Sequence, residues 1–153
     1  MRTANRRNLA VILLVEDSPA DQELVRRAVE KVTIRNELRI VEDGEEALAY
    51  LFRRGKYKAS AASPRPDLLL LDLNLPRVNG YQVLEEIRAD SKLRPMPVLV
   101  LTTSRQEKDI IRSYELGCNS FFTKPVGLGQ LTGLVQAIEK YWFETAVLPP
   151  KTE

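Results

Sequence analysis

The sequence lacks histidine altogether and contains one cysteine, Cys118. One cysteine cannot form an internal disulfide bond, and the absence of histidine excludes Cys/His zinc sites and Ser-His or Cys-His catalysis. An excess of one charge is also missing, since 23 lysines and arginines stand against 21 aspartates and glutamates. This balance does not favour nucleic acid or an anionic membrane as a partner. Any chemistry must therefore use carboxylates, hydroxyls, lysines or a metal that prefers oxygen ligands.

Long apolar runs are absent too. No stretch approaches the roughly 20 residues that cross a bilayer. Arginines precede the apolar run at 9–15, as in an export signal, but two acidic residues end the run and no Ala-x-Ala cleavage pattern follows. We expect a cytoplasmic protein with no membrane partner. The 153 residues fit one domain, which we place at 9–143, between a flexible basic tail at 1–8 and a C-terminal extension at 144–153.

Three continuous apolar runs predict buried strands at residues 11–15, 68–71 and 98–101. Because these runs do not alternate with polar residues, they are typical of parallel strands that helices cover on both faces. Two weaker segments, at 38–40 and 120–123, predict further strands, the first of them near the edge of the sheet.

Apolar residues recur at helical spacing between these strands. The predicted helices cover 19–32, 47–52, about 81–89, a segment around 110–114 that ends by Gly117, and 127–143. Ser18 is the expected N-cap of the first helix, and Pro19 its first residue. Residues 53–66 lack apolar periodicity and predict a long loop or a helix extension. The alternation of strands and helices indicates an α/β fold with right-handed crossovers.

Polar residues stand where the predicted strands end. Glu16 and Asp17 follow the first strand, Asp72 the third, Thr102 the fourth and Lys124 the fifth. In an open α/β sheet, ligands bind at the carboxyl ends of the strands. We therefore expect these side chains to converge in one cleft.

Three close carboxylates repel one another unless a cation neutralises them. Mg²⁺ suits such a site, because it takes oxygen ligands and commonly binds one or two carboxylates together with a phosphate. Lys124 is placed to neutralise Asp72 or to hold a phosphoryl oxygen, and Thr102 offers a hydroxyl donor. The set predicts an aspartyl-phosphate site in which Asp72 is the nucleophile.

The same residues, with Leu-Asn-Leu-Pro and Gly80 after Asp72 and with Pro125 after Lys124, resemble the receiver domain of two-component response regulators. The resemblance covers about residues 9–143. Spacings of 30 residues from Asp72 to Thr102 and 22 from Thr102 to Lys124 are typical of that family. It implies a flavodoxin-like (βα)5 fold, a doubly wound parallel five-stranded sheet with strand order 2-1-3-4-5. Pro76 and Asn79-Gly80 predict a turn after the strand at 68–71, where Gly80 can adopt a positive φ that other residues resist.

The resemblance implies that Asp72 is the phosphoacceptor. It further implies that Asp17 binds Mg²⁺ directly, Glu16 binds it through water, and the backbone carbonyl of Asn74 completes the protein ligands. Thr102 would contact the phosphoryl group together with Lys124.

Two other features are implied by the resemblance alone. The Lys124–Pro125 peptide bond would be cis, which proline permits at low cost. Phe121 would be the aromatic switch residue, whose ring turns inward when Thr102 moves toward the phosphate. Taken singly, Phe121 reads equally well as a core residue, and Lys124–Pro125 as a turn.

The long 53–66 segment and the C-terminal extension resemble the small stand-alone regulators that serve bacterial phytochromes and related sensor kinases. The expected partner is a sensor histidine kinase that phosphorylates Asp72, with output through changed protein contacts. Slow autodephosphorylation would be the chain's only reaction. Tyr141, Trp142 and Phe143 form an apolar tail that predicts a homodimer, unless the tail folds back onto its own domain.

Three alternatives remain. An aspartyl-phosphate phosphatase commonly carries a second aspartate two residues after the nucleophile, but this chain has Asn74 there, which cannot exchange a proton in that way. A flavin mononucleotide carrier would share the fold, but Glu16 and Asp17 would repel its phosphate. A receiver-like adaptor that is never phosphorylated stays open.

Overall fold

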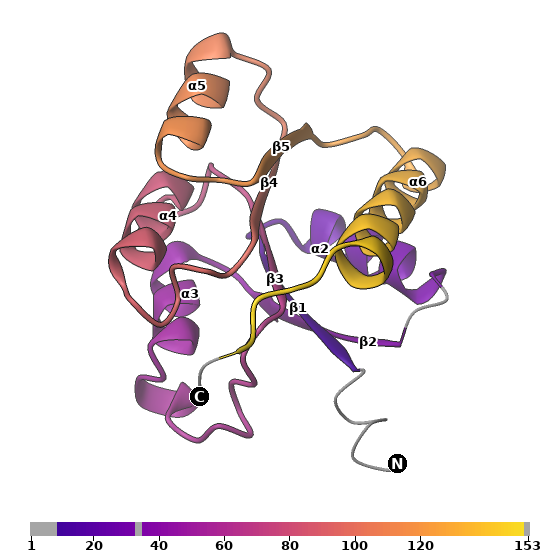
Figure 1. Ribbon diagram of the computed structural model, residues 1–153. Helices are drawn as coiled ribbons and strands as arrows, with labels where there is room; N and C mark the ends of the chain where they lie inside the picture. The colour runs from indigo at the N-terminus through magenta and orange to yellow at the C-terminus, as the bar shows by residue number, and fades with distance from the viewer. Residues whose placement is uncertain (1–8, 33–34, 152–153) are drawn as a thin grey trace.

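A parallel sheet forms the centre of the computed structural model (Figure 1), which describes residues 9–32 and 35–151. In the described part of the chain its strands are β1 (Ala10–Val15), β2 (Asn36–Val41), β3 (Leu68–Leu71), β4 (Val98–Thr102) and β5 (Ser120–Thr123). All neighbouring pairs are parallel, and the order is β2-β1-β3-β4-β5. The predicted fold and strand order are confirmed. The basic tail expected at 1–8 lies outside the described residues.

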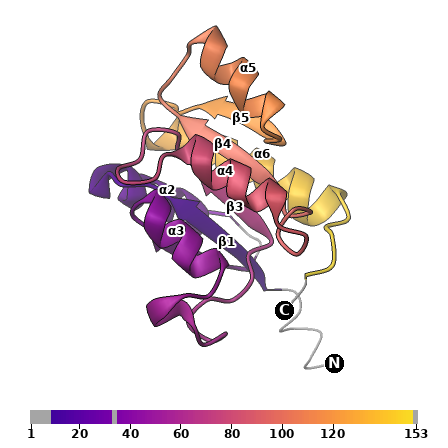
Figure 2. The ribbon, with the colours of Figure 1, turned by 90° about the vertical axis from the view of Figure 1, so that its left-hand side faces the viewer.

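Helices cover both faces of the sheet. One face carries α2 (Pro19–Glu30) and α6 (Leu128–Glu139), which also contact each other. The other carries α3 (Gly44–Leu51), α4 (Gly80–Ala89) and α5 (Glu107–Glu115), as Figures 1 and 2 show. Both edges of the sheet hold the weaker strands, β2 and β5, as the sequence predicted for the first of them.

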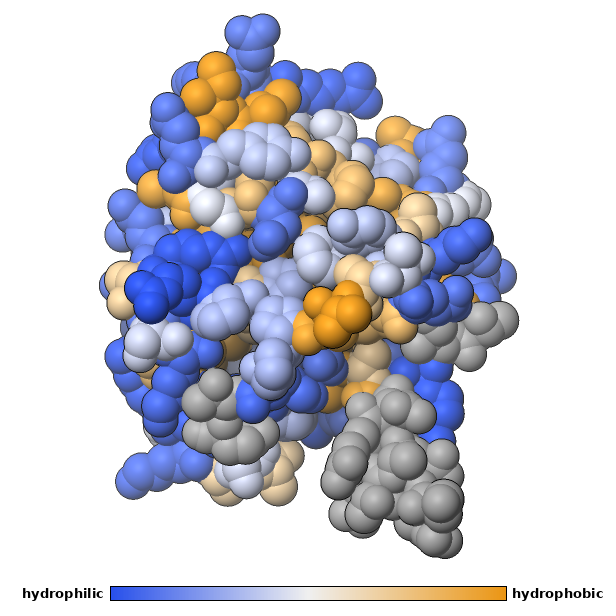
Figure 3. Space-filling view, viewed as in Figure 1, coloured by the Kyte–Doolittle hydropathy of each residue, from blue (hydrophilic) through white to orange (hydrophobic). Residues whose placement is uncertain are grey.

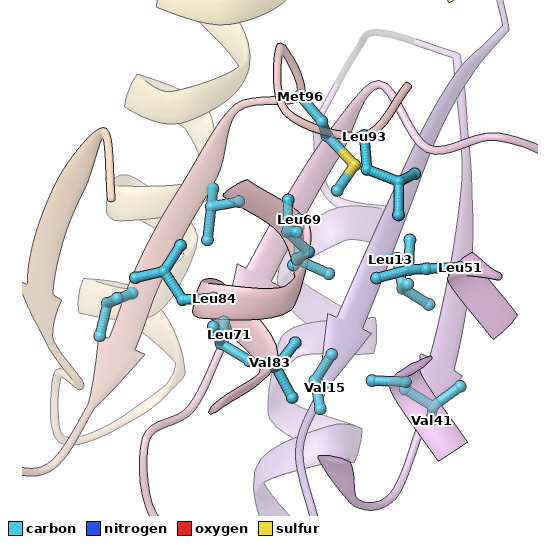
Figure 4. Packing of buried hydrophobic residues seen from close by; sticks show 14 of the residues in the cluster. Leu13, Val15, Val41, Leu51, Leu69, Leu71, Val83, Leu84, Leu93 and Met96 are labelled. Atoms are coloured by element: carbon cyan, nitrogen blue, oxygen red, sulfur yellow. The ribbon is translucent and has the colours of Figure 1, made fainter. Parts of the chain in front are cut away.

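The continuous apolar runs supply two cores, one on each face. Alternate strand residues such as Leu13, Leu69 and Leu71 join Val83 and Leu84 of α4 in the first cluster (Figure 4). The residues between them pack against α2 and α6 in a second cluster that includes Ile12, Leu14, Leu68, Leu70, Val25 and Val135. Since each fully buried leucine contributes about 1.5–3 kcal/mol, these runs fix the strand ends that carry the polar residues.

The last predicted helix needs correction. The α-helix ends at Glu139, and residues Lys140–Thr145 continue as a π-helix, in which the Ala146 N–H donates to the Tyr141 carbonyl. Gly127 precedes the helix with a φ of 94°, a left-handed conformation that an α-helix does not contain. The first helix was also predicted too long, because α2 ends at Glu30.

The loop at 53–66 and the C-terminal segment lie against the domain. The loop contains a short 3₁₀ helix, Gly55–Tyr57, whose Tyr57 hydroxyl donates to Glu46 Oε2 at 2.5 Å. Lys151 Nζ lies 3.3 Å from Asp67 Oδ2, just before β3. The far end of the C-terminal extension therefore contacts its own domain, whereas Tyr141 stays 56% exposed. Among the described residues, no helix is both long enough and apolar enough to span a membrane.

Gly80 begins α4 and does not use the positive φ that is open to glycine. The glycine is required by space instead. A Cβ atom on Gly80 would lie 2.4 Å from the Asp72 carbonyl oxygen. The missing side chain lets the start of α4 approach the residue at the end of β3.

Candidate functional site

The parallel register brings the predicted polar residues to one edge of the sheet. Val15 pairs with Leu71 and Leu71 with Val100, so the residues that follow these strands emerge side by side. Thr102 pairs with Thr123, which places Lys124 at the same edge. Glu16 and Asp72 thus stand directly after strands of fully buried apolar residues, Thr102 ends the buried strand β4, and Lys124 follows the half-buried edge strand β5.

Lys124 lies at the centre of the site. Its Nζ is 2.5 Å from Glu16 Oε1, 2.9 Å from Asp21 Oδ2 and 3.2 Å from Asp72 Oδ2. Burial alone would lower the pKa of Lys124, but the hydrogen bonds to Glu16 and Asp21 and the negative charges of Asp72 and Glu16 raise it well above its usual value. The ammonium group therefore stays charged and neutralises part of the acidic cluster.

Glu16 is a buried acid, with only 2% of its surface exposed. Burial raises the pKa of this carboxyl group, and the hydrogen bonds from Lys124 and from the Ser18 N–H offset only part of that effect. Asp72 is also buried, and the Asn74 N–H lies 3.4 Å from its Oδ1. Asp17, by contrast, is exposed at the rim.

Glu16, Asp17 and Asp72 form a candidate metal centre. Each offers a carboxylate oxygen, and the three oxygens lie within 4.8 Å of one another. An all-oxygen donor set with one exposed member suits Mg²⁺ or a similar hard cation, which keeps water ligands on its open side. The residues present therefore fit a divalent cation.

The Thr102 side chain contributes a hydroxyl group that has no hydrogen-bond partner among the described residues. This side chain is fully buried. The Thr102 carbonyl accepts a hydrogen bond from the Lys124 N–H at 2.7 Å. A buried hydroxyl without a partner costs free energy, so an unused donor lies at the same edge of the sheet as Lys124.

Phe121 is partly buried and packs against the core cluster that contains Val100 and Cys118. Its backbone N–H donates to the Tyr114 hydroxyl of α5 at 3.1 Å. The residue expected to act as the switch is therefore bonded to the neighbouring helix through its backbone.

The predicted cis peptide bond between Lys124 and Pro125 was wrong, because this bond is trans in the structure. Proline lowers the cost of the cis isomer, but trans remains the favoured form by about 0.5–1 kcal/mol. Lys124 reaches Glu16, Asp21 and Asp72 with the trans bond in place.

Two groups of residues escaped the sequence interpretation. Asp21 contacts Lys124 from the first turn of α2. Tyr81 and Ser104 donate to the two carboxylate oxygens of Asp109 at 2.6 and 2.5 Å, and so join α4, α5 and the loop after β4. Asp21 could have been found from its position one turn into the helix that starts at the site. The Tyr81–Asp109 pair has no comparable signal, because it depends on how two helices pack.

A doubly wound five-stranded sheet with an acidic trio, a lysine and a buried hydroxyl at its carboxyl edge defines the receiver class of signalling domain. Residues 12–136 match the family model described as the response regulator receiver domain. The chain belongs to this family, whose members are signalling proteins rather than conventional enzymes.

Similar proteins narrow the class. The chain is 50% identical to the response regulator Rcp1 of Synechocystis sp. over 139 residues, which cover 91% of this chain and 92% of Rcp1. The Mn²⁺-bound crystal structure of Rcp1 superposes with a TM-score of 0.83 over 92% of this chain and 99% of that one. The phosphorylated cyanobacterial phytochrome response regulator RcpA is 46% identical, with a TM-score of 0.86 over 93% and 99% of the two chains. The chain therefore resembles phytochrome response regulators.

Proposed function

We propose that the chain is a response regulator that accepts a phosphoryl group on Asp72 from a sensor histidine kinase. The observation that carries the proposal is the contact between Asp72 Oδ2 and Lys124 Nζ at 3.2 Å, beside two further acids and an unpartnered Thr102 hydroxyl. A carboxylate nucleophile, a cation site and two donors are the groups that transfer to an aspartate requires.

Mg²⁺ is the proposed cation. Asp17 and Asp72 would bind it directly, Glu16 through water, and the Asn74 carbonyl would complete the protein ligands. When bound, the ion would neutralise charge on the transferred phosphoryl group. Lys124 would hold one phosphoryl oxygen and Thr102 another. The Mn²⁺-bound form of Rcp1 supports a divalent cation in a similar protein.

Thr102 and Phe121 are the proposed switch. Movement of the Thr102 hydroxyl toward the phosphoryl group would free space for the Phe121 ring to turn inward. The bond from the Phe121 N–H to Tyr114 would carry that change to α5. The face formed by α5, β5 and α6 would then change its protein contacts, and slow hydrolysis of the phosphoryl group would reset it.

The proposed location of the protein is the cytoplasm, and the proposed donor is a sensor kinase of the phytochrome type. The proposed partners include neither nucleic acid nor membrane. The similarity to RcpA, a phytochrome response regulator whose phosphorylated form has been crystallised, supports this donor class. We place the receiver domain at 9–143 and its extension at 144–153.

A homodimer through α6 and the π-helix that follows it, with Tyr141, Trp142 and Phe143 at the interface, is part of the proposal. Tyr141 is 56% exposed, whereas Trp142 and Phe143 pack in part against the second core cluster. Figure 3 shows apolar surface over the C-terminal segment, where Val147 is 98% exposed. Sedimentation of a chain that ends at Tyr141 tests this idea, since unchanged dimerisation would refute it.

The proposed phosphorylation is tested by incubating the protein with acetyl phosphate and Mg²⁺ and measuring its intact mass. Addition of one phosphoryl mass to the wild type, its absence in Asp72→Asn and its absence in EDTA would support the proposal. No addition to the wild type, or equal addition to both proteins, would refute it.

A further inference from the structure

Asp21 contacts the lysine of the site from outside the candidate metal centre. Its Oδ2 lies 2.9 Å from Lys124 Nζ, and its side chain is 36% exposed, compared with 3% for Glu16 and 8% for Asp72. The candidate metal centre consists of Glu16, Asp17 and Asp72. Asp21 is therefore an anion that Lys124 can use without competing for a metal ligand.

The local sequence explains why Asp21 points at Lys124. Ser18 and Asp21 have the spacing of a capping box, in which the side chain at the third helical position accepts the N–H of the cap residue. In α2 the Ser18 N–H instead donates to Glu16 Oε2 at 3.0 Å. The Ser18 hydroxyl accepts from the Asp21 N–H as usual, so only the Asp21 carboxylate is diverted.

The capping box at the start of α4 shows the ordinary arrangement for comparison. There the Asn79 side chain accepts from the Gln82 N–H, and the Gln82 side chain accepts from the Asn79 N–H at 3.1 Å. In α2 the Asp21 carboxylate does not accept the N–H of the cap residue Ser18. It accepts a hydrogen bond from Lys124 Nζ instead.

Lys124 and a divalent cation need the same oxygens. Two of the three carboxylates of the candidate metal centre, Glu16 and Asp72, already contact the Lys124 ammonium group. A dication beside that group would repel it, and a buried ammonium without an anion is costly. Lys124 therefore needs another anionic partner whenever Glu16 and Asp72 bind a metal ion.

We propose that Asp21 is a positioning residue that holds Lys124 at the edge of the site when Glu16 and Asp72 bind the metal. Asp21 keeps the ammonium group paired and within reach of Asp72, so that metal binding does not leave Lys124 as an unpaired buried charge. The inference rests on the proposed function for the use of the site, but it concerns metal affinity alone.

Titration of the whole chain with Mg²⁺, followed by calorimetry, tests the proposal. Asp21→Asn keeps the size of the side chain and the backbone N–H that binds Ser18. We expect it to weaken Mg²⁺ binding about threefold to tenfold, the range that a partly exposed ion pair supports. Asp21→Glu should recover part of the affinity. Glu23→Gln is the matched control, because Glu23 is on the same helix but pairs with Arg26 and Arg27.

A double-mutant cycle separates the effect through Lys124 from a plain loss of negative charge. In a Lys124→Met background, Asp21→Asn should change Mg²⁺ affinity no more than Glu23→Gln does. An Asp21→Asn effect of equal size in both backgrounds would overturn the proposal. Unchanged affinity of Asp21→Asn in the otherwise wild-type chain would also overturn it.

The proposed phosphorylation of Asp72 and the proposed role of Asp21 can be refuted independently of each other. Absence of phosphorylation on Asp72 would refute the proposed function while leaving the metal titrations interpretable. Conversely, a phosphorylated wild type whose Mg²⁺ affinity does not depend on Asp21 would refute only the role of Asp21.

Discussion

Glu16 and Glu139 are both buried glutamates, at 2% and 1% exposure, but their surroundings differ. Glu16 contacts the Lys124 ammonium group and accepts the Ser18 N–H. Both oxygens of Glu139 lack a hydrogen-bond partner in the described part of the chain. Burial, followed by the negative charge of Glu144, raises the pKa of Glu139 to about 7.

The difference shows two ways of burying an acid. At the edge of the sheet, Lys124 and the Ser18 N–H hold the Glu16 carboxylate, and the same oxygens can bind a metal. At the end of α6, where the α-helix gives way to a π-helix, no such donor among the described residues compensates the acid. Glu139 therefore works against the folded state at neutral pH, whereas Glu16 belongs to a paired cluster.

The largest effect is expected when Lys124 is removed, because Glu16 then becomes an unpaired buried acid like Glu139. Lys124→Met leaves Glu16 and Asp72 as unpaired buried acids, so we expect unfolding in EDTA to become easier by about 3–5 kcal/mol. Mg²⁺ should restore part of this stability, since it binds only the folded site. Urea denaturation with and without Mg²⁺ measures both changes.

Lys151→Met is the control for that experiment, because Lys151 pairs with Asp67 closer to the surface. It should cost about 1 kcal/mol or less and show no recovery with Mg²⁺. A Lys124→Met protein that is as stable as wild type in EDTA would contradict the role given to the lysine.

The second effect concerns pH and Glu139. Its pKa is raised on folding from 4.5 to about 7, so its contribution to stability is fully present below pH 4.5 and is lost as the pH rises through 7. The loss should amount to about 3 kcal/mol. Glu139→Gln removes the titration, and urea denaturation across this range should show a flatter profile. Parallel profiles for wild type and Glu139→Gln would refute this explanation.

The third effect concerns Asp109, an acid that accepts hydrogen bonds from two side-chain hydroxyl groups. Hydrogen bonds from Ser104 and then Tyr81 lower the pKa of Asp109, so its contribution to stability is present above pH 3.8 and is lost as the pH falls through the lowered value. Tyr81→Phe removes one donor and should cost about 1 kcal/mol. Side-chain NMR titration should show the pKa of Asp109 moving upward, and an unmoved pKa would contradict the assignment.

The smallest effect is expected at an exposed ion pair. Arg77 lies 3.1 Å from Glu45 and 3.6 Å from Asp43, but its side chain is 65% exposed. Arg77→Ala should change the free energy of unfolding by about 0.5 kcal/mol or less. A loss of stability as large as that of Lys124→Met would contradict the claim that buried ion pairs contribute more to stability than exposed ones.

The comparison also explains what the sequence could predict. Glu16 and Asp72 follow strands that are continuous apolar runs, and Lys124 follows the weaker strand at 120–123, so the parallel sheet predicted that the three residues would meet. Glu139 stands beside Ile138 on a helix, where a charged residue reads as part of the solvent face. Glu139 is the last residue of α6, and the π-helix that begins at Lys140 has no sequence signal of comparable strength.

The remaining misses have local causes. Asp21 has the spacing of an ordinary capping residue, and only the loop geometry that turns Glu16 onto the Ser18 N–H frees its carboxylate. The cis bond at Lys124–Pro125 came from family resemblance, and the structure has a trans bond. The sequence interpretation explained Gly80 by the conformational freedom of glycine. The structure shows that a glycine is required there because a Cβ atom would clash with the Asp72 carbonyl oxygen.

The most direct test of the central claim is to locate the phosphoryl group within the chain. After reaction with acetyl phosphate and Mg²⁺, borohydride reduction of the acyl phosphate and peptide mass mapping should mark the peptide that contains Asp72. Labelling confined to Asp72, and lost in Asp72→Asn, is the predicted result. Labelling at another carboxylate, or at none, would contradict the assignment of this edge of the sheet as the phosphorylation site.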